Sequence, residues 1–261
     1  MKAAHIHSLP CAFVFSAFLL GTVLTQTHSF AHQSDAPGYH EHPAGHTADH
    51  HRSGQRGAVE LRIGPYLPQV DEELSSAPYE ATFGSNPSVT VGLEGDYQAL
   101  RIPYLGTLGP GFGIHWFRRG GIAEFTSGDP GSAHKNSLWI IPMYAVGVLR
   151  VDIFRRAFNV PLVPYVKGGL AWSLWSSRDA GSVSVVDGEK AKGSSIGLQY
   201  QVGLMIHLNP ISPQTAIDMD NSAGVNHSYL FAEWWASDVD SFGAGMQTGD
   251  ATWVAGVALE F

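Results

Sequence analysis

The stretch Ile196-Gly-Leu-Gln-Tyr-Gln-Val-Gly-Leu-Met-Ile-His-Leu208 carries the pattern on which the predicted fold depends. Large apolar or aromatic residues occupy every second position, and the positions between them hold Gly, Gln, Met and His. Successive side chains of a β-strand point to opposite faces, so this pattern predicts a strand with one apolar face. Strands of soluble proteins typically have only about five or six residues. The length of this one therefore favours a strand that crosses a bilayer.

Seven further segments of similar length show alternation, and clusters of Gly, Pro, Ser, Asn and Asp separate them. A strand tilted by ~45° needs about 9 to 11 residues to cross a bilayer. The fold class is all-β in either case, because alternation also fits a soluble β-sandwich. Eight long consecutive strands favour an eight-stranded antiparallel transmembrane β-barrel over the sandwich. The predicted strands are 58–66, 88–98, 108–118, 137–151, 162–176, 195–208, 226–237 and 252–261.

The last predicted strand runs to the final residue and ends on an aromatic side chain. Its sequence, Thr252-Trp-Val-Ala-Gly-Val-Ala-Leu-Glu-Phe261, resembles the assembly signal of bacterial outer-membrane β-barrels, carried here by Trp253, Val257, Leu259 and Phe261. The region from Val59 onward resembles small barrels of the OmpA/OmpW type, and more narrowly the uncharacterised outer-membrane barrel proteins of myxobacteria. Glu60-Leu-Arg-Ile-Gly-Pro-Tyr66 and Leu149-Arg-Val-Asp152 carry the narrower likeness.

This resemblance implies a location and two partners. The location is the bacterial outer membrane, and the partners are outer-membrane lipid and the barrel-assembly machinery, which would bind the C-terminal strand. The sequence does not determine the oligomeric state.

The residues before the first strand form two further predicted segments. Residues 1–31 contain Lys2, an apolar run from Cys11 to Leu24, and Ser29-Phe-Ala31, which is the order of features in a cleavable signal peptide. The alternative is an uncleaved N-terminal anchor, although the run is short for a spanning helix. Residues 32–57 are rich in His, Gly and Ala without an apolar period, which predicts a disordered periplasmic tail. The barrel would then occupy residues 58–261.

Charge and cysteine content exclude several classes of partner and site. Removal of residues 1–31 takes away Lys2 and no acidic residue, which leaves 14 basic and 23 acidic residues and a formal charge of −9. This charge argues against nucleic acid as a partner. Cys11 is the only cysteine, so the mature chain would hold neither a disulfide nor a thiolate metal site.

An even number of strands would place both barrel ends, and with them the N-terminal tail and the C-terminus, on the periplasmic side. The connections 67–87, 119–136, 177–194 and 238–251 would be outer loops, and their polar, Gly-rich and acidic composition is typical of surface loops. The connection 209–224 is longer than a periplasmic turn. Ser212 as a candidate N-cap and Pro213 at the first helical position predict a short periplasmic helix there.

The face turned away from lipid collects the charged residues of the predicted strands. An eight-stranded barrel has an interior that side chains just fill, and charges enclosed in it must pair. The sequence therefore predicts a salt-bridged plug. The alternative is a narrow path for ions or small apolar solutes, lined by Glu94, Asp96, Arg62 and Lys167, whose acidic excess would favour cations. The inward residues are Glu60, Arg62, Glu94, Asp96, His115, Arg150, Asp152, Lys167, Glu233 and Glu260, with the face of Arg150 left ambiguous by its strand.

Aromatic residues gather near the predicted strand ends. Amphipathic rings settle at headgroup level, so we expect a girdle. Stacking on a sugar or an apolar ligand at the barrel mouth is the alternative. The residues concerned are Tyr66, Trp116, Phe117, Trp139, Trp172, Trp175, Trp234, Trp235 and Trp253.

The histidines of the tail suggest one cofactor hypothesis. His40, His42, His46, His50 and His51 are closely spaced, and a flexible tail with neutral imidazoles can bind Zn, Ni or Cu weakly. The alternative is a solvated tether whose charge changes between about pH 5 and 8. The sequence implies no other cofactor.

Catalysis is not expected. His115, His207 and His227 are isolated, and the sequence contains no nucleophile elbow, HExxH or phosphate-loop motif. Ser228 follows His227, but neighbours in a strand point to opposite faces. The predicted function is therefore a plugged structural or interaction barrel that is not an enzyme, with the narrow channel and the metal-sequestering tail as alternatives.

Overall fold

The computed structural model describes residues 56–72, 77–122, 135–179, 182–186 and 189–261. The predicted signal peptide lies outside the described residues, as does the predicted tail up to residue 55. The five histidines of the tail metal hypothesis, His40, His42, His46, His50 and His51, fall in that part of the chain.

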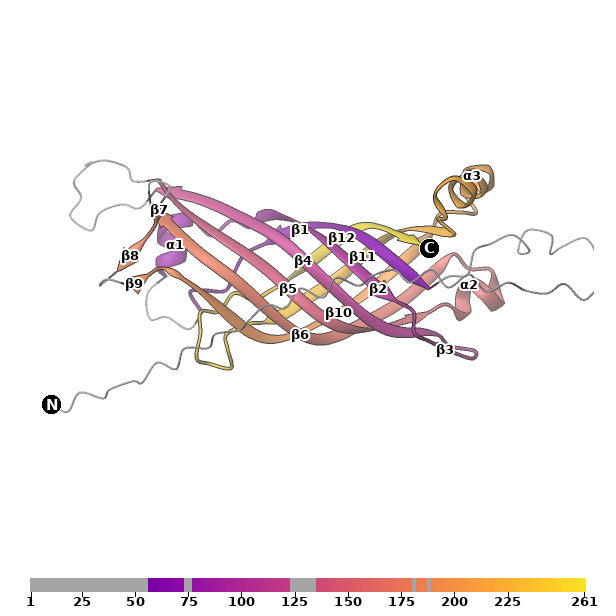
Figure 1. Ribbon diagram of the computed structural model, residues 1–261, viewed down its shortest axis with the longest axis horizontal. Coiled ribbons are helices and arrows are strands. Elements are labelled where there is room, and N and C mark those ends of the chain that lie inside the picture. Colours follow the sequence, from indigo (N-terminus) through magenta and orange to yellow (C-terminus); the bar gives the residue numbers. More distant parts are fainter. Residues whose placement is uncertain (1–55, 73–76, 123–134, 180–181, 187–188) are drawn as a thin grey trace, which may run out of the picture. The chain divides into compact units, whose positions relative to one another are not determined.

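Eight long strands form a closed antiparallel barrel within these described ranges (Figure 1). Each pairs with the long strand before and after it, and β1 pairs with β12 to close the sheet. This arrangement confirms the predicted all-β, eight-stranded barrel, in which closure removes the long free edges of the sheet. The strands are β1 (Gly57–Tyr66), β2 (Ser88–Tyr97), β4 (Gly106–Ile122), β5 (Lys135–Val151), β6 (Leu162–Asp179), β10 (Lys192–His207), β11 (His227–Asp238) and β12 (Asp250–Glu260).

The barrel wall is uneven in height. β4, β5 and β6 have 17, 17 and 18 residues, whereas β1 and β2 have 10 each. The prediction ended β4 at residue 118, but the strand continues through Arg119-Gly-Gly-Ile122. The extension lacks alternating apolar residues because it lies beyond the apolar outer surface of the barrel. Its pairing with β5 nevertheless continues there. An alternation-based prediction therefore stops too early there.

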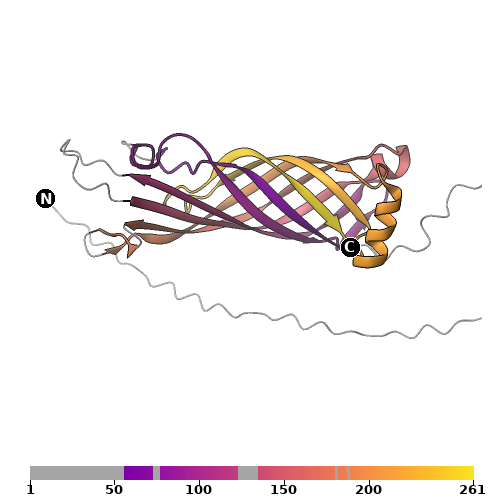
Figure 2. The same cartoon turned by 90° about the horizontal axis from the view of Figure 1, so that it is seen from above.

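Short elements lie at the two ends of the barrel. At the end that holds the C-terminus lie β3 (Leu100–Ile102), α2 (Ile153–Phe158) and α3 (Pro213–Ala223) (Figures 1 and 2). We call this the C-terminal end. At the other end, which we call the α1 end, lie α1 (Pro78–Phe83), β7 (Ser182–Val183), β8 (Val185–Val186) and β9 (Glu189–Lys190). None of the described helices is both long and apolar enough to span a membrane.

Of the three helices, α3 was predicted and begins at Pro213, directly after Ser212. The Ser212 side chain makes no capping hydrogen bond to the backbone, and its Oγ instead lies 2.8 Å from Thr215 Oγ1. The helix ends at Gly224, which adopts the left-handed conformation that glycine tolerates best. The helices α1 and α2 were not predicted, because six residues are too few for a visible helical period.

The outward face of the wall is apolar. On β1, Val59, Leu61 and Ile63 are about half exposed, and the residues between them are buried. We call the outward-facing large apolar side chains the apolar belt. It includes Val59, Leu61, Ile63, Val89, Val91, Leu93, Phe112, Val166, Leu170, Leu174, Ile196, Leu198, Val202, Leu204, Ile206, Leu230 and Val257.

Candidate functional site in the barrel lumen

The centre of the lumen holds a cluster of paired charges. Glu60 and Arg62 alternate with the belt residues of β1 and are fully buried, and Glu94, Lys167 and Glu233 face them from β2, β6 and β11. We call these five residues the central ion cluster. Their burial follows from the two-residue period of the strand, because the closed sheet turns every second side chain inward.

The cations of the central ion cluster each contact several carboxylates. Arg62 pairs with Glu94 and Glu233, and its Nη1 lies 3.3 Å from Glu60 Oε2. Lys167 donates to Glu60 Oε2 at 2.8 Å and to Glu94 Oε1 at 2.5 Å. Removal of one partner of such a pair would leave a buried charge unpaired.

Arg150 extends this network toward the C-terminal end. Its two Nη atoms donate to Asp96 at 2.9 and 2.5 Å, a bidentate geometry, and Nη2 also donates to Glu60 Oε1 at 3.0 Å. Its Nη1 lies 3.9 Å from Glu260. The structure thus places Arg150, whose face the sequence left ambiguous, inside the lumen as the link between two groups of carboxylates.

Polar side chains that the sequence analysis did not single out complete the network. Tyr144 donates its hydroxyl to Glu94 at 2.5 Å, and Tyr165 donates to Glu233 at 2.8 Å. Glu260 accepts hydrogen bonds from Tyr229, at 2.9 Å, and from Gln98. The three tyrosines occupy inward positions of β5, β6 and β11, so strand parity was the signal that could have identified them.

Three carboxylates of the network could reach a common metal ion. One oxygen each of Glu60, Glu94 and Asp96 lies within 4.8 Å of the others. All three side chains are nevertheless bonded to Arg62, Arg150 or Lys167. The protein's own cations therefore already engage all three carboxylates.

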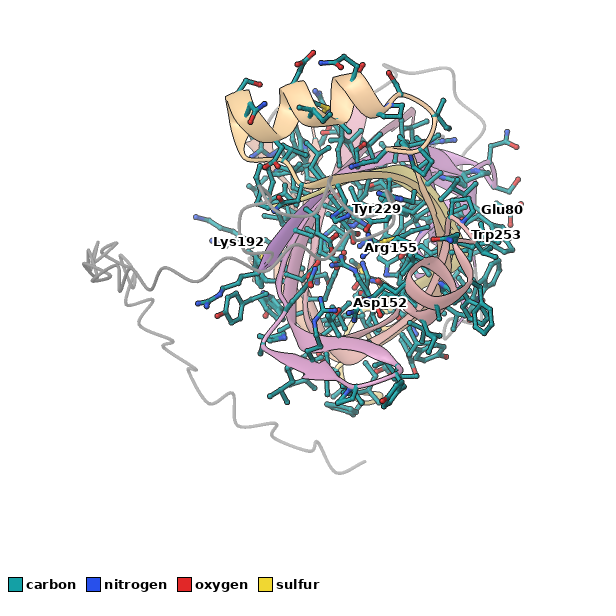
Figure 3. All side chains as sticks on the ribbon, turned by 90° about the vertical axis from the view of Figure 1, so that its right-hand side faces the viewer. Glu80, Asp152, Arg155, Lys192, Tyr229 and Trp253 are labelled. Atoms are coloured by element: carbon teal, nitrogen blue, oxygen red, sulfur yellow. The ribbon has the colours of Figure 1, made fainter. Side chains whose placement is uncertain are left out.

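The C-terminal end of the lumen is rimmed by a further group of polar residues. Asp152 precedes α2 and lies 3.5 Å from Arg101 and 3.9 Å from Arg156. Arg155 Nη1 lies 2.6 Å from His227 Nε2. Figure 3 looks onto this end and shows Asp152, Arg155 and Tyr229 around the opening of the barrel.

Between the central ion cluster and the α1 end lies a layer of buried rings. Tyr66 packs on Phe117 and Trp235 with centroid distances of 4.8 and 5.8 Å, and His115 stacks on Trp235 at 5.0 Å. We call Tyr66, His115, Phe117 and Trp235 the aromatic layer. His115 was predicted to join the charge network, but its ring nitrogens have no hydrogen-bond partner among the described residues.

The girdle prediction is wrong for three of its members. Tyr66, Phe117 and Trp235 are buried in the lumen, whereas Trp116, Trp234 and Trp253 are exposed on the outward face. The physical reason is strand parity. Trp116 and Phe117 are neighbours, as are Trp234 and Trp235, so only one residue of each pair can face outward. Trp175 is also partly buried and packs against the interior cluster.

Glycines on the inward face make room for the rings. A Cβ added to Gly92 would lie 2.6 Å from His115 Nδ1, and one added to Gly113 would overlap the Tyr144 ring. These two large lumen side chains thus each lie against a position without a side chain. The interior is filled in the manner expected for a barrel of this size.

The connection between β11 and β12 closes the α1 end of the lumen. Gln247, Thr248 and Asp250 are buried, Tyr66 donates its hydroxyl to the Thr248 carbonyl, and Ser195 donates to the Met246 carbonyl at 2.7 Å. The composition of residues 238–251 predicts a solvated surface loop. That interpretation is wrong for residues 247–250, which are buried. Thr248 contacts Tyr66 and Ser173 in the lumen, whereas Gln247 and Asp250 bond to polar groups in or next to the connections.

The four residues of the expected assembly signal lie on β12 or directly after it, where β12 pairs with β1 and closes the barrel. Trp253, Val257 and Leu259 occupy outward positions of β12, which alternate with buried Val254 and Ala258. Phe261 donates its backbone N–H to the Gly57 carbonyl at 2.9 Å. The last residue is therefore paired to the first strand.

The neighbours His227 and Ser228 lie on opposite faces of β11. His227 is buried in the lumen, 3.5 Å from Glu260, and its ring lies 4.9 Å from that of His207. Ser228 Oγ instead donates to Asn209 Oδ1 at 3.3 Å, outside the lumen. The two neighbours diverge as strand geometry requires.

No protein-family model and no curated protein sequence matches the chain. Solved structures with a similar fold include Ail, the attachment invasion locus protein of Yersinia pestis, in complex with the heparin analogue sucrose octasulfate. It shows 13% identity over 79% of this chain and 97% of that chain, with a TM-score of 0.40.

Two further structures have similar values. Neisserial surface protein A shows 15% identity over 80% of this chain and 98% of that one, with a TM-score of 0.38. The N-terminal β-barrel domain of Pseudomonas aeruginosa OprF shows 10% identity, 80% and 100% coverage and a TM-score of 0.36. Because these scores are low, the fold assignment rests on the strand pairing above. The narrower likeness to myxobacterial barrels stays a prediction.

Proposed function

We propose that this chain is an integral bacterial outer-membrane protein whose barrel is plugged by its own side chains. It would act as a structural or interaction barrel without catalysis. The observation that carries the proposal is the combination of an apolar belt outside with the fully buried central ion cluster inside. In a soluble protein the charged side chains would face outward, whereas in a bilayer the apolar belt contacts acyl chains and charge at the level of the belt is confined to the lumen.

The plug is supported at two levels of the lumen. The central ion cluster joins strands that are not neighbours in the sheet: Lys167 with Glu60 links β6 to β1 across the lumen, and Arg62 with Glu233 links β1 to β11. The aromatic layer and residues 247–250 fill the lumen toward the α1 end. An open path would need to displace both layers, and eight strands leave little room for that.

The proposed orientation places the C-terminal end in the periplasm. Both ends of the barrel domain, Gly57 and Glu260, lie there, and the connections that contain β3, α2 and α3 follow them. The α1 end would face the outside, and its loops would meet other molecules. The proposed partners are outer-membrane lipid around the apolar belt and the barrel-assembly machinery at β12, through Trp253, Val257, Leu259 and Phe261.

Membrane insertion is tested by fractionation and by refolding of the mature chain. We expect the protein in the outer-membrane fraction, and we expect refolding into lipid vesicles to give a boiling-sensitive shift in gel mobility. A chain that dissolves as a monomer without detergent, or that is released with periplasmic contents by osmotic shock, would contradict the proposal.

Single-channel recording separates the plug from the narrow channel. Purified protein in a planar bilayer should show no conductance steps, and Leu61→Ala, on the outward face, is the matched control for lumen variants. Steps in the wild type that disappear in Glu94→Ala or Lys167→Ala would establish the channel instead. The observation that favours this second candidate is the lumen charge, in which Glu60, Glu94, Asp96, Glu233 and Glu260 outnumber Arg62, Arg150 and Lys167.

A lesser proposal concerns the tail and rests on its sequence alone. His40, His42, His46, His50 and His51 would bind Zn, Ni or Cu weakly. Calorimetric titration of zinc into the mature protein and into a form without residues 32–55 tests this. Equal heats would exclude the metal hypothesis.

A further inference from the structure

The outward face of the barrel carries cations in one region. Among the described side chains of the eight barrel strands, the outward-facing cations are Arg118 on β4, Arg178 on β6 and Lys192 on β10, and all three are exposed. They lie near the α1 end of their strands. In a chain with a net charge of −8, three cations on one side of the wall form a local region of opposite sign.

Strand register aligns these cations into a row. Arg118 pairs with Trp139, Trp139 with Ser176, and Ser176 with Lys192 across β4, β5, β6 and β10. Neighbouring strands are about 4.8 Å apart, and barrel strands are tilted, so the row follows an oblique line around the wall near the α1 end. Arg178 lies two residues beyond Ser176 on the same face. We call Arg118, Trp139, Ser176, Arg178 and Lys192 the rim patch.

The rim patch is partly organised before any ligand arrives. The guanidinium of Arg118 lies over the Trp139 ring at 4.8 Å from its centroid, and that of Arg178 lies over the same ring at 5.6 Å. These contacts fix two forked donors against one indole ring, from the strands on either side of it. The outward carboxylate on the adjacent strand β11, Asp238, already accepts a hydrogen bond from Gln247 at 2.8 Å.

The apolar belt begins directly below the rim patch. Two positions along β4 and β6 from the row stand Trp116 and Leu174, and Ile196 lies four positions beyond Lys192 on β10, all exposed on the same face. A molecule bound at the patch can therefore place an anionic group on the cations and an apolar chain on the belt. Free phosphate on an exposed surface would gain only the weaker, salt-screened part of this interaction.

We propose that the rim patch binds the phosphate groups of a phosphorylated lipid in the outer leaflet. Guanidinium forks match phosphate oxygens in a bidentate manner, and Lys192 adds a third positive charge. The acyl chains of the same lipid would lie along Trp116, Leu174 and Ile196. This inference goes beyond the proposed function but rests on it, because only an inserted barrel presents the patch at headgroup level.

The test uses the mature full-length chain folded in detergent, with lipid A, a glycolipid that carries two phosphates, as the probe. Native mass spectrometry would measure its retention on the wild type and on Arg118→Gln/Arg178→Gln. We expect the affinity of the variant for lipid A to fall about tenfold or more. The matched control is Arg101→Gln/Arg156→Gln, which removes two exposed arginines at the C-terminal end and should change the affinity less than about threefold.

Three outcomes of the retention measurements would overturn the lipid site. They are equal retention by the rim variant and the wild type, equal loss in the control variant, and equal affinity of the wild type for dephosphorylated lipid A. Competition by inorganic phosphate at the lipid's own concentration would also overturn it, because it would assign the site to the free anion. Insertion into vesicles is scored on the same samples. A wild type that does not insert contradicts the proposed function, whereas one that inserts but does not retain lipid A contradicts the rim patch alone.

Discussion

Leu61 and Arg62 are neighbours on β1 and have opposite surroundings. Leu61 is 54% exposed on the outward face, whereas Arg62 is completely buried among three carboxylates. In a soluble protein the two positions would be exchanged. The comparison shows that at this level of the barrel the charged side chains face inward and the apolar ones outward, and that the two-residue period of the strand separates the two environments.

The two faces also differ in what holds them together. The inward face depends on specific pairs, because each charge in the lumen needs a partner at hydrogen-bond distance. The outward face depends only on apolar character, since acyl chains accept any apolar shape. Substitutions should therefore be costly inside when they remove a partner or a space, and costly outside when they add a charge.

The largest effect is expected for Arg62→Met. It would leave Glu94 and Glu233 without their guanidinium partner and should lower the free energy of unfolding by about 3–5 kcal/mol. Reversible urea unfolding in lipid vesicles measures the change. Arg178→Met, an exposed arginine outside the lumen, is the control. A loss below ~1 kcal/mol would mean that the central ion cluster does not support the barrel.

Leu61→Arg places a charge on the other face at the adjacent residue. Arginine on the lipid face of a barrel costs about 2–4 kcal/mol near the bilayer midplane, so we expect a loss of that size in the same unfolding experiment. Leu61→Val keeps the apolar character and should cost less than ~1.5 kcal/mol. An unchanged stability of Leu61→Arg would show that this face does not contact acyl chains.

Gly92→Ala tests the space inside the lumen. The new methyl group would overlap the His115 ring, and overpacking of this kind costs about 1–3 kcal/mol. Gly95→Ala is a matched control on the same strand, where the added Cβ would have nothing closer than 3.9 Å. Equal effects of the two substitutions on the urea midpoint would contradict tight packing of the aromatic layer.

Trp253→Ala should have the smallest effect of the series. Trp253 is exposed on the outward face and packs edge-on against Trp234 with a centroid distance of 5.4 Å. Loss of this aromatic pair should cost about 0.5–1.5 kcal/mol. Trp235→Ala, in the buried aromatic layer, should cost about 3–5 kcal/mol because it opens a cavity. A reversed order of the two tryptophans in the unfolding experiment would contradict the assignment of faces.

Most of the charged lumen positions could be predicted because parity along a strand is local information. Glu60, Arg62, Glu94, Lys167 and Glu233 all lie inward as their strands predict. Arg150 could not be placed, because apolar residues such as Val146, Val148 and Leu149 occupy both parities of its strand. Proximity to a strand end is a poor guide to the face of an aromatic residue. Tyr66 and Trp235 lie near strand ends but face the lumen, as the parity of their strands predicts.

The sequence by itself determined the number of strands, their order and the face of most charged side chains, because a two-residue period and turn residues are properties of short segments. Only the tertiary structure decided which carboxylate meets which cation, and that Thr248 returns into the lumen. These contacts depend on the register between strands and on the closure of β1 against β12. Register joins residues far apart in the chain, and no local pattern encodes it.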